Sequence, residues 1–237
     1  MAACLSLIIP CYNEEATLRR CVERILAIQT PVLPLEIIIV NDASRDKSKG
    51  VAEALASANP NIIVIHHAIN QGKGAALRTG FAKASGDYVV VQDADLEYNP
   101  EDLPRMLAPL QAGKADVVFG SRYRTAEAQR VRYFWHTLIN KGLTLFSNML
   151  TNLNLTDMET CYKMMRRDII QSLTLSENRF GIEPELVAKI AKFRIDNKPL
   201  RIFEVAIDYH GRTRSEGKKI GIRDAFRAVY CIVKYNL

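Results

Sequence analysis

The stretch Gly86–Pro100, GDYVVVQDADLEYNP, decides the fold. Tyr88–Gln92 is a short apolar run of the kind that forms a parallel strand buried on both faces. The run stops abruptly at Asp93, and the carboxylates Asp93, Asp95 and Glu97 follow at alternate positions. Ligands gather at the carboxyl ends of strands in an open α/β sheet, and hard oxygen ligands suit Mg²⁺ or Mn²⁺. The stretch therefore predicts a metal-held phosphate site, against the simpler interpretation that acidic residues only solvate a loop.

Apolar strands and helical segments alternate on the N-terminal side of this stretch. The other expected strands are residues 5–9, 36–40 and 61–65, and the expected helices are residues 13–28, 44–57 and 75–84. We expect Pro10 to end the first strand and Asn13 to cap the first helix. Strands and helices that alternate with short loops are typical of a doubly wound parallel sheet. The chain therefore predicts an α/β fold with a mainly parallel central sheet.

Polar side chains follow each of these four strands. They are Tyr12 and Glu14, Asp42, residues 70–73, and Asp93 with Asp95. Because the carboxyl ends of parallel strands lie along one edge of a sheet, we expect these groups to converge there. The chain contains neither G-x-G-x-x-G nor the Gly-Lys-Ser/Thr of a P-loop, so a glycine nest is not expected to hold the phosphates.

The second half of the chain continues the alternation less regularly. We expect strands at residues 116–119 and 201–209, helices at 101–111, 183–193 and 222–233, and a polar basic loop at 210–219. Residues 131–150 carry apolar side chains at helical spacing, among them Trp135, Leu138 and Met149. We expect this stripe to be a core face or a helix-pair contact rather than a ligand-binding surface.

Length and composition indicate one domain, residues 1–237, with a C-terminal extension. No linker or low-complexity run divides the chain. The first apolar run, residues 2–10, is shorter than a signal peptide requires, and no stretch approaches the roughly 18 apolar residues of a membrane span. Five cysteines without metal-binding spacing suit a reducing compartment. We therefore expect a cytoplasmic protein that is neither exported nor membrane-spanning.

The net charge of +6 is unevenly distributed. Residues 1–120 carry 11 Lys and Arg against 14 Asp and Glu, a net charge of −3, whereas residues 121–237 carry 21 against 12, a net charge of +9. The second half is expected to meet an anionic partner such as nucleic acid, acidic lipid headgroups or a phosphorylated substrate. A nucleic-acid-binding module is the weaker interpretation, because the chain has no aromatic-lined basic sheet or helix-turn-helix pattern.

Seven segments, taken in order, carry a family resemblance. They are IIPCYNEE, the acid in VNDAS, NQGKGAALRTGF, QDADLEYNPEDL, GSRY, DMETCYKMMRR and GRTRSEGKKI. In order and spacing they resemble the family 2 glycosyltransferases, in particular the polyprenyl-phosphate (dolichyl-phosphate) hexose synthase branch, from about residue 5 to residue 225. The resemblance implies a GT-A fold, a Rossmann-like three-layer sandwich in which a nucleoside-diphosphate sugar lies across the strand ends.

The resemblance also implies a role for individual residues on the donor side. The residues that would line the base and ribose pocket, bind the base edge or approach the nucleotide are Pro10, Tyr12, Glu14, Asp42, Gly72 and Lys73. Asp93, Asp95 and Glu97 would hold Mg²⁺ or Mn²⁺. Glu97 stands where mannosyl members commonly have Gln, which leaves UDP- and GDP-sugars both open as donors.

Basic residues of the second half match positions that hold donor or acceptor phosphates. They are Arg122, Arg212, Lys218 and Lys219. Residues 1–120 would then form the nucleotide-sugar-binding half, and residues 121–237 the acceptor-binding half with C-terminal amphipathic helices.

The chemistry of such a transfer agrees with these residue types. Departure of a nucleoside diphosphate from the sugar develops negative charge, which a metal held by Asp93 and above all by Asp95 would neutralise. Attack from the opposite face would invert the anomeric carbon. A phosphate acceptor is already ionised at pH 7, whereas a hydroxyl acceptor needs a base, for which Asp157 and Glu159 are the candidates. Polyprenyl phosphate is the favoured acceptor, with a saccharide or protein hydroxyl as the alternative.

Two other enzyme classes fit the sequence less well. Phosphatases of the haloacid dehalogenase type carry D-x-D after the first strand, whereas here it follows the fourth. A nucleotidyltransferase would carry a glycine-rich loop after its first strand, and this chain has none there.

The closing helix predicts contact with a membrane. Phe226, Val229 and Tyr230 fall on one face, and the helix follows the cluster of basic residues Arg212–Lys219. That pattern fits an interfacial helix beside a phosphate-binding loop. We expect a peripheral protein on the cytoplasmic face of a membrane, the alternative being that the apolar face packs on the sheet.

Overall fold

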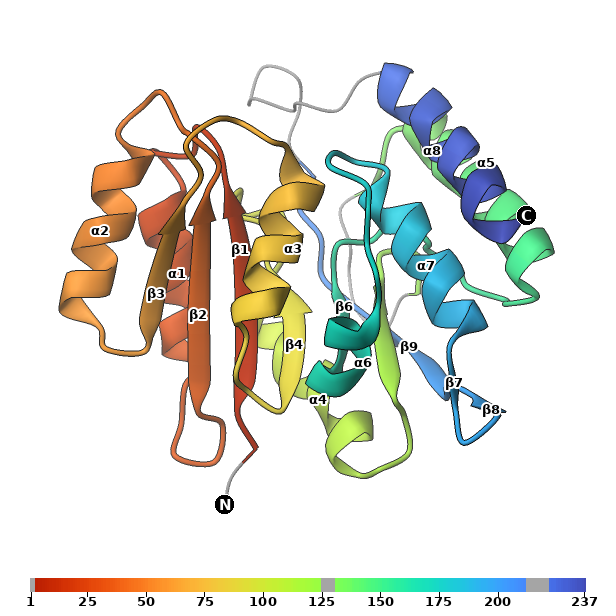
Figure 1. The fold of residues 1–237 in the computed structure, drawn as a ribbon, viewed down its shortest axis with the longest axis horizontal. Coiled ribbons are helices and arrows are strands. Elements are labelled where there is room, and N and C mark those ends of the chain that lie inside the picture. Colours follow the sequence, from red (N-terminus) through yellow and green to blue (C-terminus); the bar gives the residue numbers. More distant parts are fainter. Residues whose placement is uncertain (1–2, 125–130, 212–221) are drawn as a thin grey trace.

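The computed structural model describes residues 3–124, 131–211 and 222–237, with side chains from residue 224 in the last range. Within them a seven-stranded sheet has the order β3-β2-β1-β4-β6-β5-β9, and a two-stranded ribbon pairs β7 with β8 (Figure 1). The sheet passes through both halves of the chain without a break.

The first half is a parallel α/β unit. Its elements are β1 (Leu5–Cys11), α1 (Leu18–Ala27), β2 (Leu35–Asn41), α2 (Ser48–Ala58), β3 (Ile62–His66), α3 (Lys73–Lys83) and β4 (Tyr88–Val91). β1 pairs in parallel with β2 and β4, and β2 pairs in parallel with β3. The doubly wound parallel arrangement predicted from the sequence is confirmed.

The second half adds an antiparallel strand to the sheet. Its elements are η1 (Pro100–Asp102), α4 (Leu103–Gln111), β5 (Val117–Ser121), α5 (Phe134–Thr151), β6 (Lys163–Arg166), α6 (Arg167–Ser172), α7 (Ile182–Lys192), β7 (Arg194–Ile195), β8 (Lys198–Pro199), β9 (Ile202–Ala206) and α8 (Ile222–Asn236). β6 lies between β4 and β5 and is antiparallel to both. We did not expect this strand, because its sequence KMMR is short and half basic.

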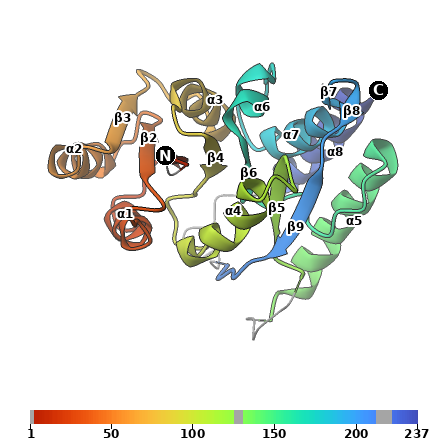
Figure 2. The same ribbon diagram turned by 90° about the horizontal axis from the view of Figure 1, so that it is seen from below.

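A hydrophobic core lies on each face of the sheet. Alternate side chains of one strand enter different cores: Leu7 and Ile9 pack with α1, α2 and α4, whereas Ile8 packs with α3, α6 and α7. Figure 2 shows these two groups of helices on opposite sides of the sheet. Burial on both faces explains why the strands are apolar at successive positions. The fold is the expected three-layer α/β sandwich.

The start of the first helix differs from the prediction. β1 continues through Pro10, which is in register with Val40, and α1 begins only at Leu18. β4 pairs with β1 only as far as Ile8, so the missing N–H of Pro10 costs no hydrogen bond to β4. Asn13 is not a helix cap, because it has a left-handed backbone with φ of 54°.

The orientation of α5 is the main correction to the sequence prediction. The apolar stripe is largely exposed, with Trp135 72% and Met149 72% accessible, whereas Asn140, Thr144 and Ser147 are buried. The polar side of the helix faces inward because it binds the loop that follows. The Thr144 hydroxyl accepts a hydrogen bond from the Met158 N–H (3.2 Å), and the Asn148 side chain exchanges two with the backbone of Leu155 (2.8 and 3.1 Å).

The helices α5, α7 and α8 pack against one another at the edge of the molecule (Figure 1). Among the residues that the structure describes, none of the helices combines the length and the apolar character that a bilayer crossing requires.

Candidate active site

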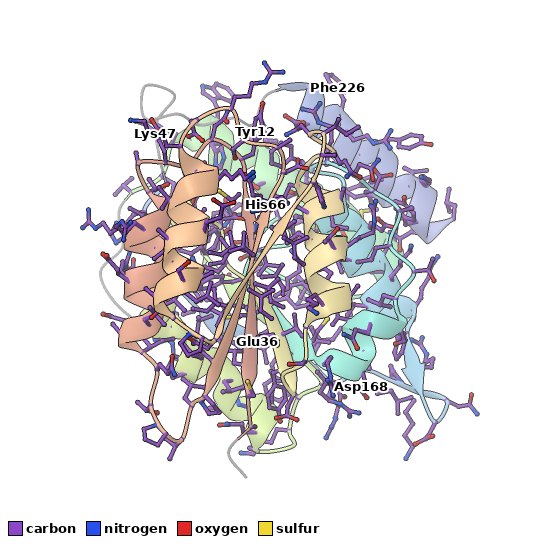
Figure 3. The ribbon with its side chains drawn as sticks, turned by 60° about the vertical axis from the view of Figure 1, so that its left-hand side comes forward. Tyr12, Glu36, Lys47, His66, Asp168 and Phe226 are labelled. Carbon is purple, nitrogen blue, oxygen red and sulfur yellow. The ribbon has the colours of Figure 1, made fainter. Side chains whose placement is uncertain are left out.

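The loops after β1 and β2 are joined by backbone-to-side-chain hydrogen bonds. The N–H of Asn13 donates to Ser44 Oγ (3.0 Å), the N–H of Glu14 donates to Ser48 Oγ (2.8 Å), and the N–H of Arg45 donates to Asn13 Oδ1 (2.8 Å). Pro10, Tyr12 and Glu14 are half-buried at this junction. Figure 3 shows Tyr12 toward the end of the molecule that holds the carboxyl ends of the parallel strands, and Glu36 toward the opposite end.

Asp42 joins the loop after β2 to the loop after β3. Its Oδ1 accepts hydrogen bonds from the Gln71 N–H (2.9 Å) and lies 2.7 Å from His67 Nδ1, and its Oδ2 accepts one from the Gly72 N–H (2.7 Å). The Asp42 side chain is buried. Both oxygens therefore already hold the 71–72 backbone, and any contact with a nucleotide base would share them.

Gly72 and Lys73 lie where the loop after β3 enters α3. Gly72 has φ of 97°, and a Cβ at this position would lie 2.4 Å from the carbonyl oxygen of Asn178, so only glycine fits. The Lys73 ammonium lies 2.8 Å from Asp93 Oδ1 and 3.0 Å from its Oδ2. Although burial favours the neutral amine, the neighbouring carboxylate of Asp93 holds the pKa of Lys73 well above its usual range. The loops after β3 and β4 are thus joined by an ion pair.

The three carboxylates after β4 have different partners. Asp93 pairs with Lys73, Asp95 Oδ1 accepts a hydrogen bond from the Glu97 N–H (3.1 Å), and Glu97 Oε2 accepts one from the Tyr209 hydroxyl (2.5 Å). Within the described part of the chain, no three His, Cys, Asp or Glu side chains form a group that could hold a metal ion. The hard oxygen donors still fit Mg²⁺ or Mn²⁺, with Asp95 and Glu97 two residues apart in the loop after β4. The metal assignment stays a prediction.

Arg122 and Asp157 form a buried ion pair. Arg122 Nε and Nη2 donate to the two Asp157 oxygens (2.7 Å each), and the Arg122 N–H donates to Oδ2 (3.0 Å). Burial opposes the charge, but Asp157 holds the pKa of Arg122 well above its usual range. The Arg122 guanidinium also lies 5.1 Å from the centre of the Tyr209 ring. This geometry makes Asp157 an anchor for Arg122 rather than a ready base.

Glu159 differs from Asp157 in its surroundings. Its Oε1 is buried and has no hydrogen-bond partner among the described residues. Burial raises the pKa of Glu159 to about 7, an effect that the positive charge of Lys163 partly offsets. A carboxyl group with this pKa can both accept and release a proton near neutrality.

A cluster of tyrosines completes the site and was missed in the sequence. The ring centres of Tyr98 and Tyr162 are 4.6 Å apart, and those of Tyr98 and Tyr209 are 5.1 Å apart. The Tyr162 hydroxyl donates to Gln92 Oε1 (2.5 Å). Tyr98 and Tyr162 stand inside the segments that carry the family resemblance, but no spacing rule brings them together with Tyr209, which follows β9. The remaining predicted site residues, Arg212, Lys218 and Lys219, lie outside the described residues.

Comparison with known proteins identifies the family of this chain. The family model described as glycosyl transferase family 2 matches residues 6–174. A dolichol-phosphate mannosyltransferase of Pyrococcus furiosus is 31% identical over 98% of the chain, and an undecaprenyl-phosphate mannosyltransferase of Micrococcus luteus is 30% identical over 90%. The chain spans 64% of the length of the first relative and 86% of the second.

A solved structure shows the same fold. The glucosyl-3-phosphoglycerate synthase of Mycobacterium tuberculosis, crystallised with Mn²⁺, UDP and glucosyl-3-phosphoglycerate, superposes with a TM-score of 0.72 at 18% identity, over 99% of this chain and 80% of that chain. The fold is therefore GT-A, and the chain belongs to glycosyl transferase family 2.

Proposed function

We propose that this protein is a metal-dependent, inverting glycosyltransferase that moves a hexose from a nucleoside-diphosphate sugar to a polyprenyl phosphate. The observation that carries the proposal is the continuous set of contacts that joins the loops after β1, β2, β3 and β4 and ends at Lys73 and Asp93. Family membership, and relatives named for transfer to dolichol phosphate and undecaprenyl phosphate, support the same activity.

The donor would lie across these joined loops. Pro10, Tyr12 and Glu14 would face the base and ribose, and Asp42 would act there directly or through the 71–72 backbone that it holds. Lys73 would meet the diphosphate. Its ammonium can exchange Asp93 for a phosphate oxygen, because both contacts are charge-assisted hydrogen bonds of similar strength.

Asp95 and Glu97 would hold the divalent ion, with Asp93 beside them. A Mg²⁺ or Mn²⁺ ion bound there would neutralise charge on the departing diphosphate. The Tyr209 hydroxyl fixes the position of the Glu97 carboxylate before any ion binds.

Arg122 would bind the acceptor phosphate. Asp157 and the Tyr209 ring hold its guanidinium in one orientation, so that little side-chain freedom is lost on binding. Asp157 is then a positioning residue. Arg212, Lys218 and Lys219 are proposed to add positive charge near the same phosphate.

The surface formed by α5 and α8 would lie against the membrane that carries the acceptor. Its exposed apolar side chains are Phe134, Trp135, Leu138, Ile139, Leu145, Met149, Phe226, Val229 and Tyr230. Basic side chains lie beside the tyrosines of α8, with Arg227 4.8 Å from the Tyr230 ring centre. Exposed aromatic and aliphatic side chains next to lysine and arginine are typical of interfacial helices.

A second candidate function is transfer to a saccharide or protein hydroxyl. The buried, unpartnered oxygen and raised pKa of Glu159 favour it, because a hydroxyl acceptor needs a base. Under this alternative the transfer rate would depend on a group with a pKa near that of Glu159.

Nucleotide binding and transfer test the proposal together. We expect UDP or GDP to raise the melting temperature of the protein only when Mn²⁺ is present. We expect Asp95→Ala to abolish transfer to a short polyprenyl phosphate. Asp168→Ala, which removes an exposed acid, is the control and should leave transfer intact. A chelator-treated enzyme that still transfers sugar at the full rate would contradict metal dependence. Turnover of a glycoside acceptor in place of the lipid phosphate, lost in Glu159→Gln, would support the second candidate.

A further inference from the structure

The helix α8 is attached to the rest of the protein by few apolar contacts. Its buried side chains, among those described, are Ala228, Cys231 and Ile232, whereas Phe226 is 74% exposed and Tyr230 is 52% exposed. So small an apolar contact gives limited stabilisation. Polar contacts add to this apolar attachment.

Glu177 supplies these polar contacts from the loop between α6 and α7. Its carboxylate accepts hydrogen bonds from Arg227 Nη2 (2.9 and 2.8 Å) and Nε (3.1 Å), from Lys234 Nζ (3.3 Å) and from the Tyr235 hydroxyl (2.8 Å). The Glu177 side chain is only 5% exposed. Burial opposes its charge, yet the hydrogen bonds from Arg227, Tyr235 and Lys234 hold the pKa of Glu177 below its usual range.

The backbone of the same loop holds the start of α3. The Asn178 carbonyl accepts a hydrogen bond from the Ala75 N–H (3.1 Å), and the Glu177 carbonyl accepts one from Arg78 Nη1 (2.6 Å). The two backbones pack so closely that position 74 has no space for a side chain, because a Cβ on Gly74 would lie 2.2 Å from the Glu177 carbonyl oxygen. Residues 177–178 therefore touch Gly72–Ala75 on one side and α8 on the other.

The charges of this junction are unequal. One carboxylate, Glu177, serves two cations, Arg227 and Lys234, whose side chains are 49% and 39% exposed. Lys234 also lies 5.8 Å from the centre of the exposed Tyr230 ring. An anionic group at the outer surface of α8 can therefore pair with the excess positive charge without displacing Glu177.

We propose that Glu177 is a positioning residue that links α8 to the donor loop Gly72–Ala75, so that an anionic lipid surface bound at α8 stabilises the donor loop. A surface that holds α8 in place also holds Glu177, and through residues 177–178 it holds the Gly72 and Lys73 backbone. By linkage, a nucleotide that orders the donor loop would in turn strengthen binding to the surface by the same factor. The identities of nucleotide and surface rest on the proposed function, whereas the link itself does not.

Amide hydrogen exchange tests the link without any ligand. In Glu177→Gln we expect peptides covering residues 71–78 to exchange roughly tenfold faster than in the wild type, because a buried charge-assisted anchor is lost. Glu23→Gln, which removes an exposed charge from α1, is the matched control and should leave them unchanged. Unchanged exchange of residues 71–78 in Glu177→Gln would overturn the proposal.

A double-mutant cycle shows whether the effect passes through α8. Arg227→Gln removes the partner of Glu177 at a half-exposed position. We therefore expect the Arg227→Gln variant to fold even if the Glu177→Gln variant does not. We expect it to accelerate exchange of residues 71–78 in the same way, and the double variant to add little to either change. Additive effects would show that Arg227 acts independently of Glu177, and an Arg227→Gln effect confined to α8 would show that the helix does not reach the donor loop; either result would contradict the proposal.

Vesicles and nucleotides then separate this link from the proposed function. Phosphatidylglycerol vesicles should slow exchange of residues 71–78 in the wild type and lower the dissociation constant of UDP or GDP with Mn²⁺ several-fold, but do neither in Arg227→Gln. Vesicle binding without either change would contradict the coupling. A wild type that binds no nucleotide but shows the exchange effects would refute the glycosyltransferase proposal and leave the link standing.

Discussion

At the scale of single residues, two neighbouring acids illustrate how surroundings determine the role of a carboxyl group. Asp157 has both oxygens on Arg122 and is fully buried. Glu159, two residues later, keeps a buried oxygen without a hydrogen bond, and its pKa is raised to about 7 by burial. The sequence offered both as bases, whereas the contacts make Asp157 an orienting group and leave only Glu159 suited to proton transfer.

Asp157→Asn should strongly destabilise the protein. It removes one charge of a buried pair and leaves Arg122 without compensation, so the free energy of unfolding should fall by about 3–5 kcal/mol. Asp168→Asn breaks an exposed ion pair with Arg166 and should cost at most about 1 kcal/mol. Urea denaturation of the two variants measures the difference, and equal small losses would be incompatible with the buried pair.

Glu159 should make stability depend on pH below neutrality. Its pKa is raised from 4.5 to about 7, so the folded state binds this proton more tightly than the unfolded state. The free energy of unfolding should therefore fall as pH rises from 4.5 to about 7, by on the order of 3 kcal/mol in total, and this contribution should not change further above pH 7. Glu159→Gln imitates the protonated form and should remove this part of the fall. Urea titrations of both proteins at several pH values give the comparison, and parallel curves would refute it.

At the scale of elements, α5 and β6 follow rules that local sequence does not contain. The inward side of α5 is polar because the backbone at Leu155 and Met158 needs hydrogen-bond partners, which Asn148 and Thr144 supply. β6 buries Lys163 inside the sheet, where Glu183 of α7 pairs with it. In both cases a polar side chain is buried where another part of the chain satisfies it.

Loss of apolar side chains from the outer side of α5 should affect surface binding but not stability. Trp135→Ser and Met149→Ser remove side chains that are already exposed, so the free energy of unfolding should change by less than about 0.5 kcal/mol. Sedimentation with anionic vesicles should weaken clearly. Val32→Ser, an equally exposed position (76%) away from α5 and α8, is the control. A large loss of stability in the α5 variants would mean that this face is packed in solution.

At the scale of the whole molecule, charge and apolar surface are concentrated in the second half. Residues 121–237 carry the net charge of +9, and the exposed apolar side chains of α5 and α8 belong to the same half. Figure 3 shows Phe226 of α8 toward the same end of the molecule as Tyr12, which follows β1. A surface that meets α8 near Phe226 would thus lie near the carboxyl ends of the strands.

Binding to anionic vesicles should weaken as salt is added. The attraction of each basic residue to an anionic surface is roughly 1 kcal/mol and is screened within a Debye length, whereas the apolar contact is not. We expect strong sedimentation at low salt, partial release at high salt, and weak sedimentation with neutral vesicles throughout. Sedimentation that does not respond to salt would assign the contact to the apolar side chains alone.

The sequence by itself determined the parallel half of the protein and the convergence of polar groups at one edge of its sheet. Successive apolar residues such as Ile37, Ile38 and Ile39 indicate a strand buried on both faces of a sheet, and each strand end is followed by polar groups. Their convergence follows from the parallel topology alone, which is why Asp42, Lys73 and Asp93 could be expected at one edge of the sheet from the sequence.

Only the tertiary structure decided how these groups are paired and which side of α5 faces out. The partners lie far apart in the chain: Lys73 with Asp93, Glu97 with Tyr209, and Glu177 with Arg227. Hydrophobic periodicity shows that a helix has an apolar side, but it does not say whether that side meets the core. For α5 this depended on buried backbone groups of residues 155–158, whose need for hydrogen bonds outweighed burial of the apolar stripe.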